Sequence, residues 1–345
     1  MKLAMTLKFS PTSGVDMDLV WEAERLGYDA VWCGEAYGTD AVTPVAWVLA
    51  QTKKIKAGTS IMQIPARTPA CAAMTAMTLQ AMSGNRFLCG VGPSGPQVVE
   101  GWHGVPFGKP LLRTREYIAI IRRILERKAP LEFDGEHYQI PYTGPGSTGL
   151  GKPLRSIVHG DPDLKIYTAA IAPAGLRTAG EVANGTLPIF MSPEKSETIT
   201  APVLEGMAKA GAEKTLADFD LAPYVRINMG EDLAACRDAV RPQLALYIGG
   251  MGARSKNFYN DLIKRFGYEA EAAKIQDHFL AGQRKEAEAA VPDALIDEIS
   301  LIGSKERIRE RLDAWKELGK DHRIGTLVLT GATKDALRVV AEAVL

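Results

Sequence analysis

The chain alternates short apolar, β-branched runs with longer segments in which apolar residues recur at helical spacing. Four short runs occur in the first half, and four more follow in the second half. Each is followed by helix-forming sequence. We therefore predict eight strands, at residues 3–9, 30–34, 55–61, 86–91, 164–169, 185–190, 224–229 and 324–330.

The predicted strands are continuous apolar runs, which is typical of parallel strands covered by helices. Eight β-α units are the number that closes a barrel, so we predict an α/β fold, a single (β/α)8 TIM barrel domain over residues 1–345. A doubly wound sheet is the alternative. Two stretches exceed ordinary connection lengths, and we interpret both as insertions on the barrel, at about 128–163 and 249–303.

Proline recurs after these strands in X–Pro pairs that are typical of a helix N-cap and first helical residue. In a parallel barrel these junctions share the C-terminal rim, so several helix N-termini converge on one mouth, which suits a phosphorylated cofactor or substrate. For any single pair, the alternative is that the proline marks an ordinary helix start and has no role in binding. The pairs are Ser10–Pro11, Thr43–Pro44, Thr68–Pro69, Gly95–Pro96, Ala172–Pro173 and Ser192–Pro193.

Composition narrows the classes of partner. The 345 residues include 41 basic and 41 acidic side chains and are 46% hydrophobic, so a globular chain with no net basic field is expected, without nucleic-acid or membrane partners. The N-terminal sequence has no signal-peptide pattern, and the four cysteines lack C-x-x-C spacing, so we expect reduced thiols in a cytoplasmic protein. The five histidines show no ligand spacing, so no metal site is expected.

Residues 90–95, GVGPSG, satisfy the G-x-G-x-x-G pattern between a strand and a helix. A dinucleotide-binding unit needs a second strand ending in an acidic residue about 20 positions later. Residues 113–127 are instead a long helical pattern. A glycine-rich rim loop that lets the backbone approach a bound ring or phosphate fits better. No G-x-S-x-G nucleophile elbow appears, so hydrolase chemistry has little support.

Several polar residues fall where the predicted strands end. Glu35 ends the second strand and either orients a cofactor or relays a proton, or else caps a neighbouring loop. Tyr37 follows in the same loop, and His103 lies just beyond the glycine-rich loop, where a structural imidazole is the alternative to a catalytic one. In the third strand the small residues Thr59 and Ser60 allow close approach of the backbone.

Six segments taken together closely resemble the luciferase-like monooxygenase superfamily, and specifically its branch of coenzyme F420-dependent oxidoreductases, which includes methylenetetrahydromethanopterin reductases. The resemblance spans nearly the whole chain. It implies a luciferase-like (β/α)8 barrel, a deazaflavin ring at the C-terminal mouth and a homodimer. The segments are GYDAVWCGEAYGTDAVTPVAW, GTSIMQIPARTP, GVGPSGPQVVEGWHG, LLRTREYI, AGEVANGTLPIF and LYIGGMGA.

The resemblance also implies site residues. A bulge with a non-prolyl cis peptide would fall at Ser60–Ile61, behind the ring, and Ala172–Pro173–Ala174 would form a helix N-terminus near the cofactor tail. Cofactor-binding residues are expected at Glu35, Gly58, Thr59, Ser60, Ile61, Met62, Gly92, Ser94, Gly95, Gln97, Ala172, Pro173 and Ala174. Catalytic candidates are Glu35, Tyr37, Gln97 and His103.

One group of relatives, acting on glucose 6-phosphate, has a histidine directly after the acidic residue and a glutamate in the loop after the fourth strand. This chain has Ala36 and Pro96 at those positions, which argues against that sugar phosphate. We expect an enzyme that transfers a hydride between the deazaflavin C5 and another small organic substrate. The alternatives are an FMN-dependent monooxygenase that takes reduced flavin from a partner reductase, and a non-catalytic flavin-binding protein.

Overall fold

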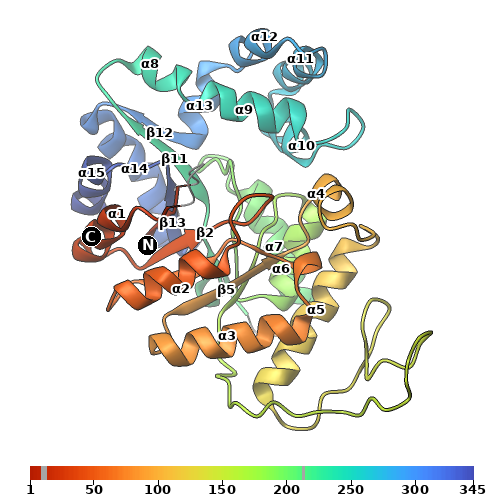
Figure 1. The fold of residues 1–345 in the computed structure, drawn as a ribbon. Coiled ribbons are helices and arrows are strands. Elements are labelled where there is room, and N and C mark those ends of the chain that lie inside the picture. The colour runs from red at the N-terminus through yellow and green to blue at the C-terminus, as the bar shows by residue number, and fades with distance from the viewer. Residues whose placement is uncertain (9–13, 212–213) are drawn as a thin grey trace.

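A computed structural model describes residues 1–8, 14–211 and 214–345. Eleven of the described strands form one sheet in which every neighbouring pair is parallel (Figure 1). Its order is β10-β9-β8-β5-β3-β2-β1-β13-β11-β12, with β4 beside β5. The bounds are β1 Lys2–Thr6, β2 Ala30–Cys33, β3 Lys56–Thr59, β4 Met62–Gln63, β5 Phe87–Gly92, β8 Ile166–Thr168, β9 Gly185–Thr186, β10 Asp220–Leu221, β11 Tyr224–Met229, β12 Ser300–Gly303 and β13 Thr326–Thr330.

The sheet closes through the segment that contains β10 and the start of β11. On one side the Tyr224 amide donates to the Pro188 carbonyl at 2.8 Å, and on the other the Val328 amide donates to the Pro223 carbonyl at 3.0 Å. The fold is therefore an α/β barrel of the TIM type. Each of the eight predicted strand positions contains a strand, although most strands are shorter than predicted.

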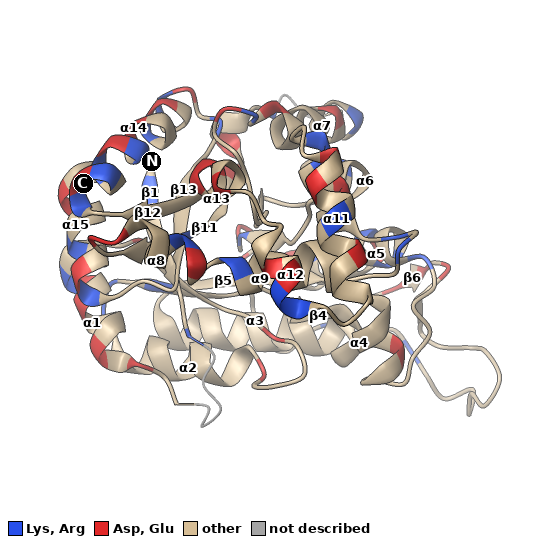
Figure 2. Ribbon diagram, turned by 90° about the horizontal axis from the view of Figure 1, so that it is seen from above, with Lys and Arg blue, Asp and Glu red and all other residues tan. Residues whose placement is uncertain are grey.

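Helices surround the closed sheet (Figures 1 and 2). Neighbours pack in the order expected of a barrel, with contacts between α1 and α15, α3 and α5, α6 and α7, and α14 and α15. A shorter helix, α4 Pro96–Gly101, follows β5. The outer helices are α1 Met17–Leu26, α2 Val42–Gln51, α3 Pro69–Ser83, α5 Pro110–Glu126, α6 Pro173–Val182, α7 Glu197–Lys209, α14 Lys305–Lys320 and α15 Lys334–Val344.

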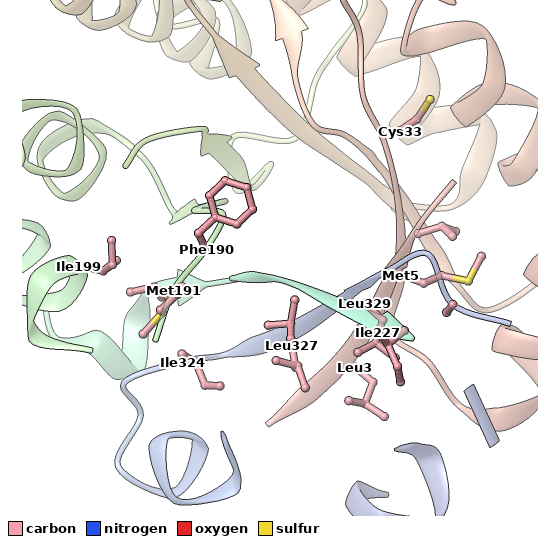
Figure 3. Close-up of a cluster of buried hydrophobic side chains, with 14 of the residues drawn as sticks. Leu3, Met5, Cys33, Phe190, Met191, Ile199, Ile227, Ile324, Leu327 and Leu329 are labelled. Atoms are coloured by element: carbon pink, nitrogen blue, oxygen red, sulfur yellow. The ribbon is translucent and has the colours of Figure 1, made fainter. Parts of the chain in front are cut away.

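Alternation along the strands divides the core into two layers. Leu3 and Met5 of β1 pair in register with Leu327 and Leu329 of β13, and all four are buried in the layer between strands and helices (Figure 3). The intervening residues point into the barrel, because successive strand side chains face opposite ways. This inner cluster consists of Ala4, Ala30, Trp32, Ile61, Leu88, Tyr167, Leu187, Ala222 and Val328, with Tyr224 packed against it.

Two connections leave the barrel. Residues 128–163 contain a small antiparallel hairpin, β6 Phe133–Asp134 with β7 Gln139–Ile140, and otherwise form a long irregular loop after α5 (Figure 1). The second connection joins β11 to β12 and forms the group of helices drawn together above the barrel in Figure 1. Its elements are α8 Leu233–Asp238, α9 Arg241–Ala245, a π-helical turn η3 Leu246–Gly250, α10 Phe258–Arg265, α11 Glu269–Leu280, α12 Arg284–Ala289 and α13 Asp293–Ile299.

The sequence did not reveal strand β12, which lies inside the range 249–303 that we predicted as an insertion. The strand has only four residues, and it follows α13 without a loop. An apolar run of that length cannot be told from a buried helix by periodicity alone.

The proline pairs have mixed outcomes. Thr68–Pro69, Gly95–Pro96 and Ala172–Pro173 are N-cap and first helical residue of α3, α4 and α6, as predicted. Thr43–Pro44 lies inside α2, which starts at Val42, and Ser192–Pro193 precedes α7 by several residues, so those two predictions were wrong. Ser10–Pro11 lies outside the described residues.

Among the helices that the structure describes, none has both the length and the apolar character required to span a lipid bilayer.

Candidate functional site at the C-terminal mouth of the barrel

The third barrel strand ends in a bulge at the mouth. Strand β3 stops at Thr59, the peptide bond between Ser60 and Ile61 is cis as predicted, and the chain resumes pairing in β4. The amide of Ser60 donates to the Cys33 carbonyl at 2.6 Å, which ties the bulge to β2. Ser60 and Ile61 therefore form the tip of the bulge.

The bulge is held from behind by its other predicted residues. The Thr59 hydroxyl donates to the Gly90 carbonyl at 2.8 Å and accepts from the Gly90 amide at 3.0 Å. Met62 is fully buried in the outer core, and its backbone pairs with Val91 of β5. In this structure both side chains support the bulge, so only Ser60 and Ile61 are left to face a bound molecule.

Glycine is required around the bulge because of close packing. A Cβ on Gly58 would come within 2.6 Å of the Trp32 indole, and one on Gly92 would lie 3.0 Å from the Ile61 side chain. The backbone of β5 therefore approaches the Ile61 side chain closely, whereas the predicted approach of this glycine-rich loop to a bound ring or phosphate stays a prediction.

Glu35 is held by an arginine. Its carboxylate receives two hydrogen bonds from Arg67, at 2.8 and 2.9 Å, and a third from the Gln63 amide at 2.8 Å. The Glu35 side chain is 8% exposed and that of Arg67 is 17% exposed. Hydrogen bonding to Glu35 is the main cause that raises the pKa of Arg67. Glu35 therefore holds the rim loops together in this structure, which is the capping alternative considered for it.

Gln63 connects Glu35 to His103, a link that the sequence did not reveal. The Gln63 side chain is buried, and its amide nitrogen donates to the carbonyls of Glu35 and Ala36 at 2.9 and 3.0 Å. Its oxygen then faces Nε2 of His103 at 2.5 Å. Because an amide oxygen only accepts, Nε2 of His103 must carry the proton. This leaves Nδ1 of His103 to accept from another group.

Tyr37 belongs to an exposed aromatic group beside this network. Its ring lies 6.4 Å from the ring of Trp102, the residue before His103. Burial, with a smaller contribution from Tyr37, raises the pKa of Tyr247, which lies in the π-helical turn of the second connection. The rim loop after β2 therefore faces the helices above the barrel. Asp40, in the same loop, caps α2 by accepting from the Val42 and Thr43 amides.

The loop after β5 presents three further predicted residues. Ser94 has a left-handed backbone with φ of 61°, an uncommon conformation for a non-glycine residue. Gly95 is the N-cap of α4, and Gln97 lies exposed in its first turn. The four catalytic candidates thus lie in the loops after β2 and β5, with Glu35 and His103 joined through Gln63.

Ala172, Pro173 and Ala174 form the N-terminus of α6, as predicted. No side chain caps this end, so its first amides are free to receive a ligand. Arg265 of α10 reaches the same place and donates to the Ile171 carbonyl at 3.0 Å. This brings a cation from the second connection beside the helix N-terminus.

Strand β11 contributes two residues that sequence reasoning did not select, Tyr224 and Arg226. Val225 and Ile227 between and beyond them are buried in the outer core, so Tyr224 and Arg226 face the barrel interior. The alternation in YVRINM was visible in the sequence and could have identified them.

Burial disfavours two of the cysteines, Cys33 and Cys89, as nucleophiles. All four are free, and burial raises the pKa of Cys33 and of Cys89 to about 12. Within residues 1–8, 14–211 and 214–345, no three His, Cys, Asp or Glu side chains gather as a metal site would require.

Comparison with known proteins finds a family model and named relatives that match most of this chain. The family model described as luciferase-like monooxygenase matches residues 16–322. A Mycobacterium tuberculosis protein named as a coenzyme F420-dependent oxidoreductase is 40% identical over 328 residues, covering 95% of this chain and 93% of that protein. The 5,10-methylenetetrahydromethanopterin reductase of Archaeoglobus fulgidus is 26% identical over 329 residues, covering 94% of this chain and 92% of that enzyme.

Among solved structures, the coenzyme F420-dependent tetrahydromethanopterin reductase of Methanopyrus kandleri superposes with a TM-score of 0.77. The two chains are 23% identical, and the match covers 100% of this chain and 97% of the other. At this identity the likeness supports the barrel fold.

Proposed function

The chain belongs to the luciferase-like monooxygenase family, and we propose that within it the protein is a coenzyme F420-dependent oxidoreductase acting on a small organic substrate. That it is an oxidoreductase follows from its relatives. The observation that carries the cofactor proposal is the Ser60–Ile61 bulge at the barrel mouth, with glycines packed against it, in a chain 40% identical to a protein named for F420 dependence.

The residues present fit such a cofactor. Gly92 makes room for the Ile61 side chain at the tip of the bulge, and this apolar side chain offers a surface on which a flat ring could lie. The uncapped N-terminus of α6, with Arg265 beside it, offers amides and a cation to a phosphate in the tail. When bound, the deazaflavin supplies a ring carbon that accepts or gives a hydride.

The chain's own residues then position and shield the reactants. The ion pair of Glu35 with Arg67 fixes the loop after β2 relative to the bulge, because both Arg67 and Gln63 belong to the segment that follows Ile61. His103 is oriented by Gln63, so its free Nδ1 is the group best placed in this network to hold or move a proton. Tyr37, on the loop after β2, and Tyr247, in the helices above the barrel, are close enough to influence each other, so a bound substrate would meet aromatic side chains there.

A titration with oxidised F420, and separately with FMN, tests the cofactor. Trp32 packs against Gly58 beneath the bulge, so its fluorescence should report a ring bound there. We expect micromolar or tighter binding of F420 and much weaker binding of FMN. The reverse preference would favour the FMN-dependent monooxygenase, and binding of neither would overturn the proposal. Oxidation of reduced F420 by a carbonyl compound would argue against a non-catalytic carrier.

A homodimer is the assembly we propose, formed through the outer faces of α2 and α3. These two helices contain no charged residue, whereas α1, α14 and α15 carry both signs (Figure 2). Trp47, Met74 and Met82 on them are 55%, 63% and 78% exposed. A second copy presenting the same neutral face would cover these side chains symmetrically.

We also propose that the protein works in the cytoplasm. The support is its cysteine usage, because all four thiols are free and one of them, Cys71, is exposed. Free exposed thiols are kept reduced in that compartment.

A further inference from the structure

Arg226 lies at the mouth of the barrel on a strand whose register is fixed. It pairs with Thr330 of β13 on one side and with Ser300 of β12 on the other. Its neighbours Val225 and Ile227 are 0% and 1% exposed in the outer core. The Arg226 side chain therefore points inward, at the C-terminal end of the barrel strands.

The guanidinium is held against the backbone of the next loop. A Cβ on Gly331 would come within 2.6 Å of Cζ of Arg226, and Gly331 has a left-handed φ of 73°. The position thus requires glycine both for its conformation and for its lack of a side chain. Arg226 packs flat on this loop, which gives its donors a fixed direction.

Arg226 has no acceptor among the residues that the structure describes. Across the described part of the chain it forms no hydrogen bond or ion pair, and its Nε is buried without a partner. Burial lowers its pKa, and no acidic group opposes that effect. Other partly buried arginines are satisfied: Arg67 by Glu35, and Arg86 by backbone carbonyls and the Thr52 hydroxyl. A half-buried cation without a partner is unfavourable unless a bound anion completes it.

Two other polar groups that face the barrel interior can donate, whereas the Asp220 carboxylate, at the start of β10, accepts from Tyr167 and Thr326. The Trp32 indole nitrogen is buried without a hydrogen-bond partner, and the buried Tyr224 hydroxyl has only the Ser60 side chain beside it. Trp32 belongs to the inner cluster of the barrel, and Tyr224 packs against it. With donors on this side and no carboxylate paired to them, the interior is built to receive oxygen acceptors.

We infer that Arg226 binds the carboxylate of an anionic organic substrate. This rests on the proposed function, because the Ser60–Ile61 bulge must seat the cofactor ring. Tyr224 lies at the level of Ser60. Burial raises the pKa of Tyr224, and a hydrogen bond with the Ser60 side chain partly offsets that rise. Arg226 is two residues further toward the opening, about 7 Å along the strand. A substrate bound on the face of the cofactor ring that points toward the opening would place its carboxylate near Arg226.

The cofactor's own anionic groups have a different place. Its phosphate is assigned to the N-terminus of α6, which follows β8, while Arg226 lies on β11, with β9 between the two strands in the closed barrel. A substrate carboxylate is therefore the anion that the position of Arg226 favours. The substrate class would be small carboxylic acids that carry a group able to exchange a hydride.

Calorimetric titration tests this on the enzyme saturated with F420. The probes are acetate, hexanoate and benzoate, each compared with its neutral amide in low-chloride buffer. We expect at least one acid to bind about tenfold or more tightly than its amide, because a charge-assisted pair is lost in the amide. Arg226→Gln should remove that difference. Arg309→Gln, on the exposed face of α14, should keep it.

A second variant covers the case in which Arg226→Gln fails to fold. The Gly331→Asn change is compatible with the left-handed backbone at this position, but its Cβ enters the space of the Arg226 guanidinium. The preference for acids should therefore fall although Arg226 is still present. Equal binding of every acid and its amide by the native enzyme would overturn the inference. So would a preference that survives Arg226→Gln.

The two proposals can fail separately. If Arg226→Gln weakens F420 binding and leaves acid binding unchanged, the anion belongs to the cofactor, and the substrate assignment is wrong. If the native protein does not bind F420 at all, the proposed function fails. The same acid and amide comparison on the cofactor-free protein then decides whether Arg226 binds carboxylates.

Discussion

Glu35 and Arg67 form a bidentate ion pair across the barrel rim, with both terminal guanidinium nitrogens within 2.9 Å of the carboxylate. The pair joins the loop after β2 to the segment after the bulge. Because both side chains are largely buried, each is an unfavourable charge without the other.

Removing one partner should therefore be worse than removing both. We expect Arg67→Met to lower the free energy of unfolding by about 3 kcal/mol, since it leaves the Glu35 carboxylate buried and unpaired. Glu35→Gln combined with Arg67→Met should be less destabilising than the sum of the two single changes. Denaturant unfolding of the four proteins gives the coupling energy, and a value near zero would contradict the pairing.

The tautomer of His103 is a second expectation. The Gln63 oxygen faces Nε2 of His103, so nitrogen-15 NMR should show the neutral ring protonated at Nε2. Gln63→Leu removes the acceptor and should leave a mixture of tautomers. His278 bonds through Nδ1 to Gln283 on the surface and serves as the control, because its signal should not change in that variant. Protonation of His103 at Nδ1 in the native protein would reverse the assignment.

The packing of Gly92 on Ile61 can be tested through cofactor affinity. Gly92→Ala places a Cβ 3.0 Å from the Ile61 side chain, so the tip of the bulge must shift by a few tenths of an ångström. We expect F420 affinity to fall about tenfold, or about 1.4 kcal/mol, with little change in unfolding temperature. Gly101→Ala enters open space at the end of α4 and should leave affinity unchanged. Equal affinities in the two variants would remove the bulge from the cofactor site.

Dimerisation predicts a change of both mass and thiol reactivity. Met74→Glu introduces two charges into the interface, one from each copy, and should convert the dimer to a monomer in sedimentation experiments. Cys71, exposed on the same helix, should then react faster with a thiol reagent at pH 8, while Cys33 and Cys89 stay unreactive until unfolding. Leu204→Glu, on α7, is the matched surface control. A native monomer would contradict the proposal.

Glu22 provides a pH-dependent link between α1 and α15. Hydrogen bonds from Arg25, and then from Arg338, lower the pKa of Glu22 to about 2. A carboxyl whose folded pKa is depressed stabilises above its unfolded pKa, near 4.5, and loses that effect as the pH falls toward 2. The unfolding temperature of Glu22→Gln should therefore be lower than that of the native protein at pH 6, and the gap should close below pH 3. Arg338→Gln should show the same trend.

The sequence revealed those features that depend on neighbouring residues. The eight strand positions and the helix start at Thr68–Pro69 are local patterns of apolar spacing and capping. The cis bond at Ser60–Ile61 came from the likeness of whole segments to a family, and the structure contains it. By contrast, Ser192–Pro193 has the form of a helix start, but α7 begins only at Glu197 because a turn intervenes.

The features that the sequence did not reveal depend on contacts between distant positions. Gln63 and His103 are 40 residues apart, and nothing in either local pattern marks their hydrogen bond. The lack of an acceptor for Arg226 is equally invisible in a sequence, because it requires knowing every neighbour of the guanidinium. Glu35 was predicted as a candidate, but its ion pair with Arg67, 32 residues away, was not.

The connection that contains the helices above the barrel starts after β11 and returns to the neighbouring strand β12. Met229 and Gly303 are partners in register, and the Gly230 amide donates to the Gly303 carbonyl at 3.0 Å. The connection returns at Ser300, whose partner in register is Arg226. Because it leaves and returns on adjacent strands, its length and content place little constraint on the path of the barrel. Residues 230–299 can therefore change in length and sequence without rebuilding the barrel strands, so the helices that cover the candidate site are structurally independent of the Ser60–Ile61 bulge.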